Sequence, residues 1–205
     1  MTIAVYRNDL PDNVVFKDVV AVDCETLGLN PLRDRLCVVQ LSAGDGTAHL
    51  VQFDGSCYEA PNLKAQLSNP QLLKVFHFAR FDLAALQHWL GLWAMPVFCT
   101  KIASKLTRTY TSKHGLKDVV KELLEIQISK EEQSSDWGAE TLTKAQQNYA
   151  AADVLHLHEL HRILTERLKR EGREELALRT FQYLPVRAEL DLLGWGDVDI
   201  FAHKG

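Results

Sequence analysis

The sequence predicts an α/β fold in a single domain, and three observations support this. Short apolar runs rich in β-branched residues fill much of the first half of the chain. After Pro96, apolar residues recur at helical spacing almost to the end. A helical pattern also separates two of the strand-like runs, as a crossover in a layered α/β structure would. The 205 residues show no internal repeat, low-complexity stretch or convincing linker, so we expect one compact unit.

Four strands are predicted, at residues 19–25, 36–44, 47–53 and 72–78. The first of them, VVAVDCE, is almost wholly apolar up to its acidic end, which is typical of a buried central strand. Glycine, asparagine and proline between residues 28 and 35 predict a loop after it. Because the first three strands follow one another closely, we expect them to form a meander.

Six helices are predicted, at residues 62–68, 80–92, 99–110, 115–126, 144–170 and 174–193. In the second of these, Phe81, Trp89 and Leu90 belong to the apolar pattern, and Gly91 supplies a stop signal. The second half of the chain is therefore expected to be mainly helical, with a tail from residue 194.

The composition limits the kind of partner and the location. A net charge of −4 argues against a long electrostatic track for nucleic acid, because phosphate neutralisation supplies most non-specific affinity. The N-terminal segment is charged from Arg7 and resembles no signal peptide, and no stretch approaches the ~20 apolar residues of a membrane span. We therefore expect a cytoplasmic protein with no membrane partner. Its scattered cysteines should be reduced and mostly buried: Cys24, Cys37, Cys57 and Cys99.

Asp23 and Glu25 stand at the end of the first predicted strand. Residues two apart on a strand point to the same face, so the two carboxylates should converge. Burying two like charges together is costly, and a divalent cation with hard oxygen ligands, Mg²⁺ or Mn²⁺, would offset that cost. The alternative is that the strand has ended and both acids are solvated. The short motif alone favours that alternative.

Two further acidic positions lie later in the chain. Asp82 comes at a strand-to-helix junction, where an acid is also favourable simply because of the helix dipole. Tyr149 and Asp153 are four residues apart in a helical pattern, which places them one turn apart on the same face. Each of these could equally be an ordinary surface residue, so no single position decides the chemistry.

The ordered set of motifs is more specific than its parts. The chain resembles the DEDDy branch of the DnaQ-like, ribonuclease D-like 3′–5′ exonuclease superfamily. The resemblance rests on a D-x-E strand, an Asp that opens a helix and a late Y-x-x-x-D helix, in that order. It includes the supporting stretches TLGLNPLRDRLCVVQLS and HGLKDVVKELL. The resemblance implies a ribonuclease H-like fold, with a mixed five-stranded sheet flanked by helices. It also implies one exonuclease domain over residues 1–205, with a core at about 15–170 and a C-terminal helix and tail at 171–205.

The same resemblance implies a hydrolysis that uses two divalent metal ions, Mg²⁺ or Mn²⁺. In the family, the residues matching Asp23, Glu25 and Asp153 hold the ion that activates water, and those matching Asp23 and Asp82 serve the second ion. The residue matching Tyr149 orients the water. The expected enzyme is a metal-dependent 3′–5′ exoribonuclease that releases 5′-mononucleotides.

Within the superfamily, the sequence is similar to the compact nanoRNase C branch, which cleaves RNA dinucleotides and very short oligonucleotides. Ribonuclease D continues into helical RNA-binding domains that have no counterpart here, and the acidic charge also favours a short substrate. The resemblance implies a homo-oligomer, commonly an octameric ring, acting on short RNA that includes breakdown products of cyclic dinucleotides. The alternatives are ribonuclease D-like trimming of tRNA or other RNA 3′ ends, and a non-catalytic nucleic-acid-binding module.

Several residues are candidates for substrate contacts. Leu29 lies at the offset from the D-x-E motif where related short-RNA nucleases insert a leucine between two bases, although a loop leucine anchored in the core is as reasonable. Thr26 is adjacent to the D-x-E motif, and His77 is either a substrate contact or a hydrogen-bonded core histidine close to the site. For the 5′-phosphate, a basic cluster at residues 101–117 offers three candidates, which act either within one chain or across a subunit interface: Arg108, Lys113 and His114. A solvated face is the default for such runs.

Overall fold

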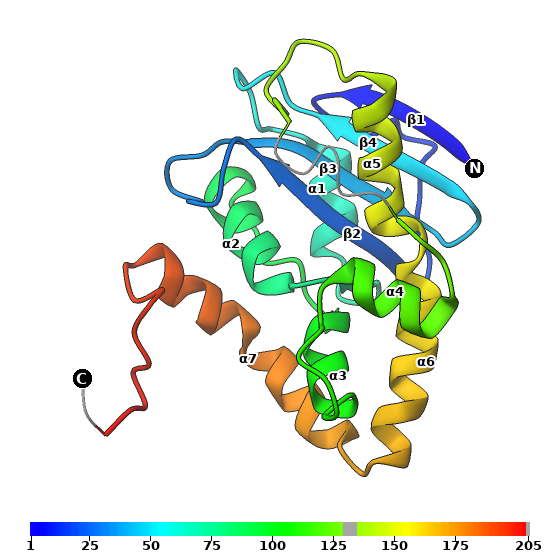
Figure 1. Cartoon of the computed structure of the whole chain (residues 1–205). Helices are drawn as coiled ribbons and strands as arrows, with labels where there is room; N and C mark the ends of the chain where they lie inside the picture. Colours follow the sequence, from blue (N-terminus) through cyan, green and yellow to red (C-terminus); the bar gives the residue numbers. More distant parts are fainter. Residues whose placement is uncertain (129–134, 204–205) are drawn as a thin grey trace.

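The structure is a computed structural model that describes residues 1–128 and 135–203, and it confirms the α/β class (Figure 1). One mixed sheet contains β1 (Thr2–Arg7), β2 (Val19–Thr26), β3 (Leu36–Ser42), β4 (Thr47–Gln52), β5 (Leu73–Phe76) and β6 (Val97–Cys99). The strand order is β1-β4-β3-β2-β5-β6, so β2 lies inside the sheet. Strands β2, β3 and β4 form the predicted antiparallel meander, while β1, β5 and β6 join in parallel.

The predicted count of five strands is wrong, because the described part of the chain forms a sheet of six. Strands β2 to β6 form five adjacent strands of the sheet, and β1 adds a sixth by pairing with β4 from Thr2↔Thr47 to Arg7↔Gln52. The pattern missed β1 because an edge strand is partly exposed and its apolar alternation is weak. It missed β6 because that strand has only three residues.

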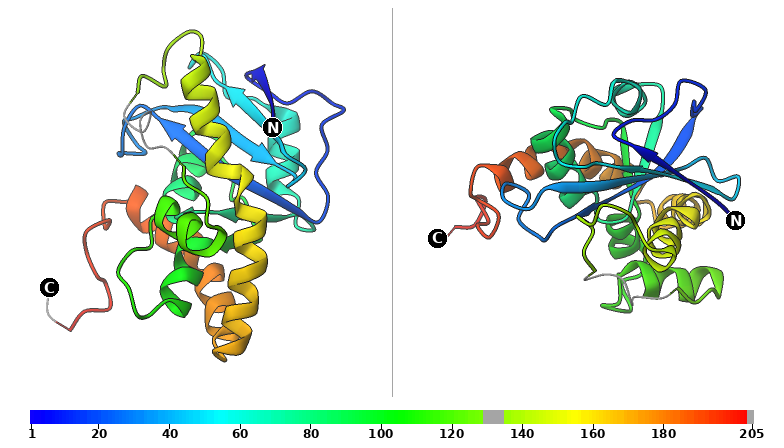
Figure 2. Two further views of the ribbon diagram at one scale, coloured as in Figure 1. Left: turned by 45° about the vertical axis from the view of Figure 1, so that its right-hand side comes forward. Right: turned by 90° about the horizontal axis from the view of Figure 1, so that it is seen from above.

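Within residues 1–128 and 135–203, seven helices pack around the sheet: α1 (Pro61–Ser68), α2 (Ala79–Leu90), α3 (Thr100–Thr107), α4 (Leu116–Leu124), α5 (Lys144–Leu155), α6 (Leu157–Arg170) and α7 (Glu174–Leu192). Helix α5 packs over β2, β3 and β4 on one face, and α1 lies on the opposite face (Figure 2). The single helix predicted over residues 144–170 is wrong, since the chain breaks at His156 between α5 and α6. Both halves carry apolar residues, so the periodicity could not reveal the break.

The C-terminal helix is fastened to the rest of the molecule. It packs against α2 and β6, and Asp191 on α7 accepts two hydrogen bonds from Arg80 on α2, at 2.5 and 2.6 Å. Arg80 also donates to the carbonyl of Gly196 in the tail, at 2.8 Å.

All four cysteines are free thiols and three are buried, as predicted. In the described ranges we find no helix with both the length and the apolar character of a membrane span.

Candidate active site

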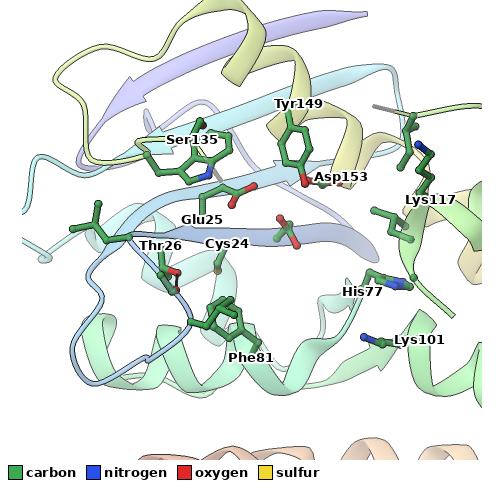
Figure 3. A pocket seen from close by; sticks show the side chains of 18 residues that line it. Cys24, Glu25, Thr26, His77, Phe81, Lys101, Lys117, Ser135, Tyr149 and Asp153 are labelled. Atoms are coloured by element: carbon green, nitrogen blue, oxygen red, sulfur yellow. Dashed lines mark hydrogen bonds between the residues drawn. The ribbon is translucent and has the colours of Figure 1, made fainter. Parts of the chain in front are cut away.

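Glu25 on β2 points toward α5 (Figure 3). Asp23 lies on the same face of the strand, as the strand period predicts. On the neighbouring strand, Gln40 is paired in register with Asp23 and is fully buried. Its side-chain amide donates to Asp23 at 3.4 Å and to Glu25 at 3.5 Å. Gln40 therefore helps to orient both carboxylates. The sequence analysis missed it, although a glutamine inside the apolar run LCVVQLS was a visible signal.

Helix α5 brings the third carboxylate to the same place. Asp153 offers an oxygen that lies with one oxygen each of Asp23 and Glu25 within a mutual distance of 4.8 Å. Tyr149, one turn earlier, points toward this group and packs against the indole of Trp137 at 5.9 Å between ring centroids. A capping box between Thr143 and Gln146 fixes where α5 begins, and so fixes the height of both residues over the sheet.

Asp82 approaches from the other side of β2. It lies in the first turn of α2 and is 2% exposed, where its carboxylate faces the thiol and the backbone amide of Cys24. It is close enough to Asp23 to raise the pKa of that carboxyl. The structure thus brings together all five residues that the sequence singled out: Asp23, Glu25, Asp82, Tyr149 and Asp153.

The four carboxylates are poorly suited to being ionised together without a cation. Burial raises the pKa of Asp82 to about 8 and that of Asp153 to about 7. Burial, and then the neighbouring carboxylates, raise the pKa values of Asp23 and Glu25 well above the usual range. Among the described residues, no salt bridge involves any of the four. A divalent cation would offset the repulsion between these buried carboxylates, and their oxygens are the hard ligands that such a cation prefers.

Tyr149 remains a neutral phenol in this setting. Its pKa is raised above the ordinary value, first by burial and then by the negative charges of Asp153 and Glu25. A protonated phenol can donate a hydrogen bond or orient a water, but it is not a base at neutral pH.

A cavity of about 560 Å³ opens above the acids. Leu29 lies at its rim with 87% of its surface exposed, so the alternative that this leucine anchors the loop in the core is wrong. Thr26 also lines the cavity, but its hydroxyl donates to the carbonyl of Gly28 and so stabilises the loop. The loop closes around Asp34, which accepts a hydrogen bond from the backbone of Asn30.

The basic residues that line the cavity differ from those predicted. Lys101 on α3 and Lys117 on α4 line it, and Lys101 Nζ lies 4.1 Å from the ring centroid of Phe78. Arg108 does not reach the cavity, because it is fully buried in an ion pair with Glu122. The expectation that Arg108 binds phosphate is therefore corrected. The periodicity of the cluster could not show which basic side chain would be drawn into the interior.

Of the three remaining candidates for substrate contacts, one lines the cavity and two do not. His77 lines the cavity, and its Nδ1 lies 2.8 Å from the Thr100 hydroxyl, which donates to the carbonyl of Phe76. Burial lowers the pKa of His77 to about 3, so its ring is neutral at physiological pH. Lys113 is exposed and His114 is half-buried against Ser104, and neither is among the cavity-lining residues.

Comparison with known proteins places this site in a family. Residues 7–169 match the family described as 3′–5′ exonuclease. The chain belongs to the 3′–5′ exonuclease family. The predicted DnaQ-like exonuclease membership and the ribonuclease H-like fold are thereby confirmed.

Solved structures of one such nuclease are similar to this chain over almost its whole length. NrnC of Brucella melitensis, solved bound to pGG, is 58% identical with a TM-score of 0.95, and the match covers 99% of each chain. The same protein with bound Mg²⁺ is 57% identical with a TM-score of 0.94, covering 99% of this chain and 100% of that one. The predicted similarity to the nanoRNase C branch is confirmed.

More distant members are named ribonuclease D. That of Gluconacetobacter diazotrophicus is 35% identical over 154 residues, which are 75% of this chain and 39% of the relative. The structure of Escherichia coli RNase D is 25% identical with a TM-score of 0.75, covering 84% of this chain and 45% of that one. The chain thus spans about two fifths of the length of the curated relative, from Gluconacetobacter diazotrophicus.

Proposed function

We propose that this chain is a two-metal-ion 3′–5′ exoribonuclease that cleaves RNA dinucleotides and very short oligoribonucleotides to 5′-mononucleotides. The observation that carries the proposal is a single cavity with three carboxylates converging at its floor, an exposed leucine at the rim and two lysines in its wall. Its volume of about 560 Å³ is that of a pocket for one small ligand. The NrnC structure with pGG supports the same substrate class.

Each residue has a role in this scheme. Asp23, Glu25 and Asp153 would hold one divalent ion, and Asp23 with Asp82 would hold a second. Bound Mg²⁺ or Mn²⁺ supplies Lewis acidity toward the phosphate and lowers the pKa of a water. Tyr149 orients that water through its neutral hydroxyl.

Residues around the acids orient the carboxylates and contact the substrate. Gln40 keeps the β2 carboxylates in place by donating to both. Leu29 offers an apolar surface to a base, and Lys101 and Lys117 supply positive charge for phosphate. The positive charge is local to the cavity wall, which suits a chain with a net charge of −4 and a short substrate.

Substrate length tests the proposal. Initial rates with Mg²⁺ or Mn²⁺ are compared on 5′-phosphorylated RNAs of two to ten nucleotides, and the dinucleotide should be cleaved fastest. The second candidate, trimming of longer RNA 3′ ends, is favoured by the name ribonuclease D that the curated relatives carry. It would give rates that change little with length. Absence of hydrolysis at every length would instead support a non-catalytic module.

Replacing Leu29 with alanine should raise the KM for an RNA dinucleotide by about tenfold, since burying a leucine side chain against a base contributes about 1.5 kcal/mol. The melting temperature should stay within about 1 °C of the wild type, because a side chain that is 87% exposed adds little to folding. Leu32→Ala is the matched control: Leu32 is 48% exposed in the same loop and is not among the cavity-lining residues. Equal KM changes in both variants would argue against a base contact.

We also infer that the protein self-associates, with an octameric ring as the form that its resemblance implies. Exposed apolar side chains gather where α7 gives way to the tail: Leu193, Trp195, Val198, Ile200 and Phe201. Such a surface is typical of a protein interface. Light scattering should give a mass eight times the 23.2 kDa of one chain, and a monomer at micromolar concentration would exclude the ring.

A further inference from the structure

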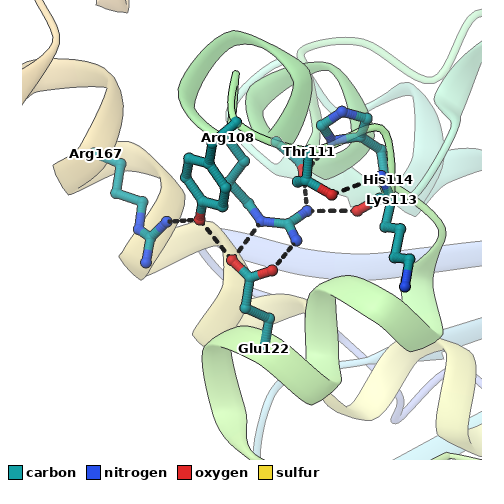
Figure 4. A network of polar contacts seen from close by, with 8 residues as sticks. Arg108, Thr111, Lys113, His114, Glu122 and Arg167 are labelled. Atoms are coloured by element: carbon teal, nitrogen blue, oxygen red, sulfur yellow. Dashed lines mark hydrogen bonds and ion pairs between the residues drawn. The ribbon is translucent and has the colours of Figure 1, made fainter.

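Arg108 is an unusual feature of the wall beside the cavity, because a fully buried arginine is rare unless it is paired. It follows the last residue of α3, and its side chain turns back into the space between α3 and α4 (Figure 4). Each of the three guanidinium nitrogens donates at least one hydrogen bond. Nε and Nη2 donate to the two carboxylate oxygens of Glu122 on α4, with Nε to Oε1 at 3.0 Å.

The third nitrogen of Arg108 reaches two other parts of the chain. Nη1 donates to the hydroxyl of Ser104 at 2.8 Å and to the carbonyl of Lys113 at 2.7 Å. The Ser104 hydroxyl in turn lies 2.9 Å from Nδ1 of His114. One side chain therefore connects the last turn of α3, the end of the α3–α4 loop and the last turn of α4.

The segments that Arg108 connects carry the two lysines of the cavity. Lys101 lies in the first turn of α3, and Lys117 lies in the first turn of α4, directly after the loop that ends at Gly115. Gly115, Leu116 and Lys117 all line the cavity. The separation of the two lysines thus depends on how α4 is held against α3.

We propose that Arg108 is a positioning residue, which sets the place of the Gly115–Lys117 wall relative to Lys101 so that both lysines meet the phosphate groups of the RNA. This inference rests on the proposed function, since it assigns the lysines to the substrate. The planar guanidinium is needed because its Nε–Nη2 edge pairs with a carboxylate while Nη1 stays free for Ser104 and Lys113. A lysine in this place keeps the charge but cannot make the same set of bonds.

Arg108→Lys tests the role through the loop itself, without any substrate. Hydrogen exchange of the backbone amides of residues 113–117 should become at least about tenfold faster, because the carbonyl of Lys113 and the carboxylate of Glu122 lose their shared donor. Glu122→Gln breaks the same ion pair from the other side and serves if Arg108→Lys does not fold. Unchanged exchange of residues 113–117 in both variants would overturn the proposal, whether or not the chain is a nuclease.

Kinetics on a 5′-phosphorylated RNA dinucleotide give the second measurement. Arg108→Lys should raise KM at least about tenfold and change kcat less than threefold, because Arg108 contacts none of the four active-site carboxylates. Arg173→Lys is the matched control: Arg173 also donates to a backbone carbonyl of α3, that of Leu106 at 2.5 Å, but does not bond to the loop. A KM effect equal to that of this control would mean that Arg108 contributes only stability.

A double-mutant cycle connects Arg108 to Lys117. If Arg108 acts through Lys117, then Arg108→Lys added to Lys117→Met should raise KM less than twofold beyond Lys117→Met alone. Fully additive effects would contradict the proposal. Wild-type hydrolysis is measured first on RNAs of every length: a wild type inactive on all of them refutes the proposed function, while the exchange measurement still decides the role of Arg108.

Discussion

Replacing Asp153 with asparagine should reduce the metal-dependent release of 5′-mononucleotide by at least about 10³-fold, which corresponds to about 4 kcal/mol of lost transition-state stabilisation. Asparagine keeps the shape of the side chain but removes one of the three carboxylates that converge within 4.8 Å. It also removes a buried negative charge that faces Glu25 and Asp23. The metal-free variant should therefore be more stable than the metal-free wild type at pH 8.

This pair of opposite effects distinguishes a metal site from a structural cluster. Initial rates with Mg²⁺ and with Mn²⁺ give the first effect, and thermal unfolding in a chelator gives the second. Glu159→Gln is the control, because Glu159 is an exposed acid on α6 whose partner is Arg162. That variant should keep the wild-type rate. A rate for Asp153→Asn within tenfold of the wild type would refute the assignment of this carboxylate.

The metal-free protein should lose stability as the pH rises from 6.5 to 8. Above pH 6.5 the unfolded chain has ionised its carboxyl groups, whereas the folded state still binds protons on Asp82, with a pKa of about 8, and on Asp153, with a pKa of about 7. The folded state holds more protons, so the free energy of unfolding falls with rising pH, by about 1.4 kcal/mol per pH unit for each proton. The expected loss is on the order of 2–4 kcal/mol, or about 5–10 °C in Tm for a chain of this size.

Other groups oppose this fall only in part. Burial lowers the pKa values of four histidines, so between pH 6.5 and about 7.5 the unfolded chain releases more histidine protons than the folded state does: His49, His77, His156 and His161. Lys74, buried against two backbone carbonyls, has a pKa lowered to about 8 and acts in the opposite direction only from about pH 7.5 upward. Saturating Mg²⁺ or Mn²⁺ should abolish the fall, because metal ligands must be deprotonated and the bound ion favours that state.

The measurement is thermal unfolding at pH 6.5, 7.25 and 8, in a chelator and in excess metal. The double variant Asp82→Asn plus Asp153→Asn should show a much smaller fall in the chelator, because two of the four carboxyl groups with raised pKa values are gone and two charges no longer repel Asp23 and Glu25. A wild-type profile that is flat without metal, or a slope that metal leaves unchanged, would contradict the linkage.

The five acidic-site residues could be predicted because each depends on local order. The strand period places Asp23 beside Glu25, and the helix period places Tyr149 beside Asp153. Asp82 follows from its position at a strand-to-helix junction. The resemblance supplied what local order cannot, namely that these three segments meet.

Other features depend on contacts that no periodicity encodes. Arg108 and Lys117 belong to the same basic cluster in the sequence. In the structure, however, Arg108 is buried in an ion pair with Glu122 on α4, whereas Lys117 lines the cavity. Leu29 stays exposed at the rim of the cavity, in a loop where the backbone amide of Asn30 donates to Asp34. The break at His156 leaves both helices apolar on their inner sides, so the pattern runs through it.

The distribution of the site over β2, α2 and α5 has a consequence for biosynthesis. The D-x-E strand emerges early from the ribosome, but the carboxylate of Asp153 follows only after about three quarters of the chain has been made. Until α5 docks on the sheet, the metal-binding group is incomplete. Under the proposed function, a nascent copy is therefore expected to leave surrounding RNA uncleaved until the late helix has folded onto the early strand.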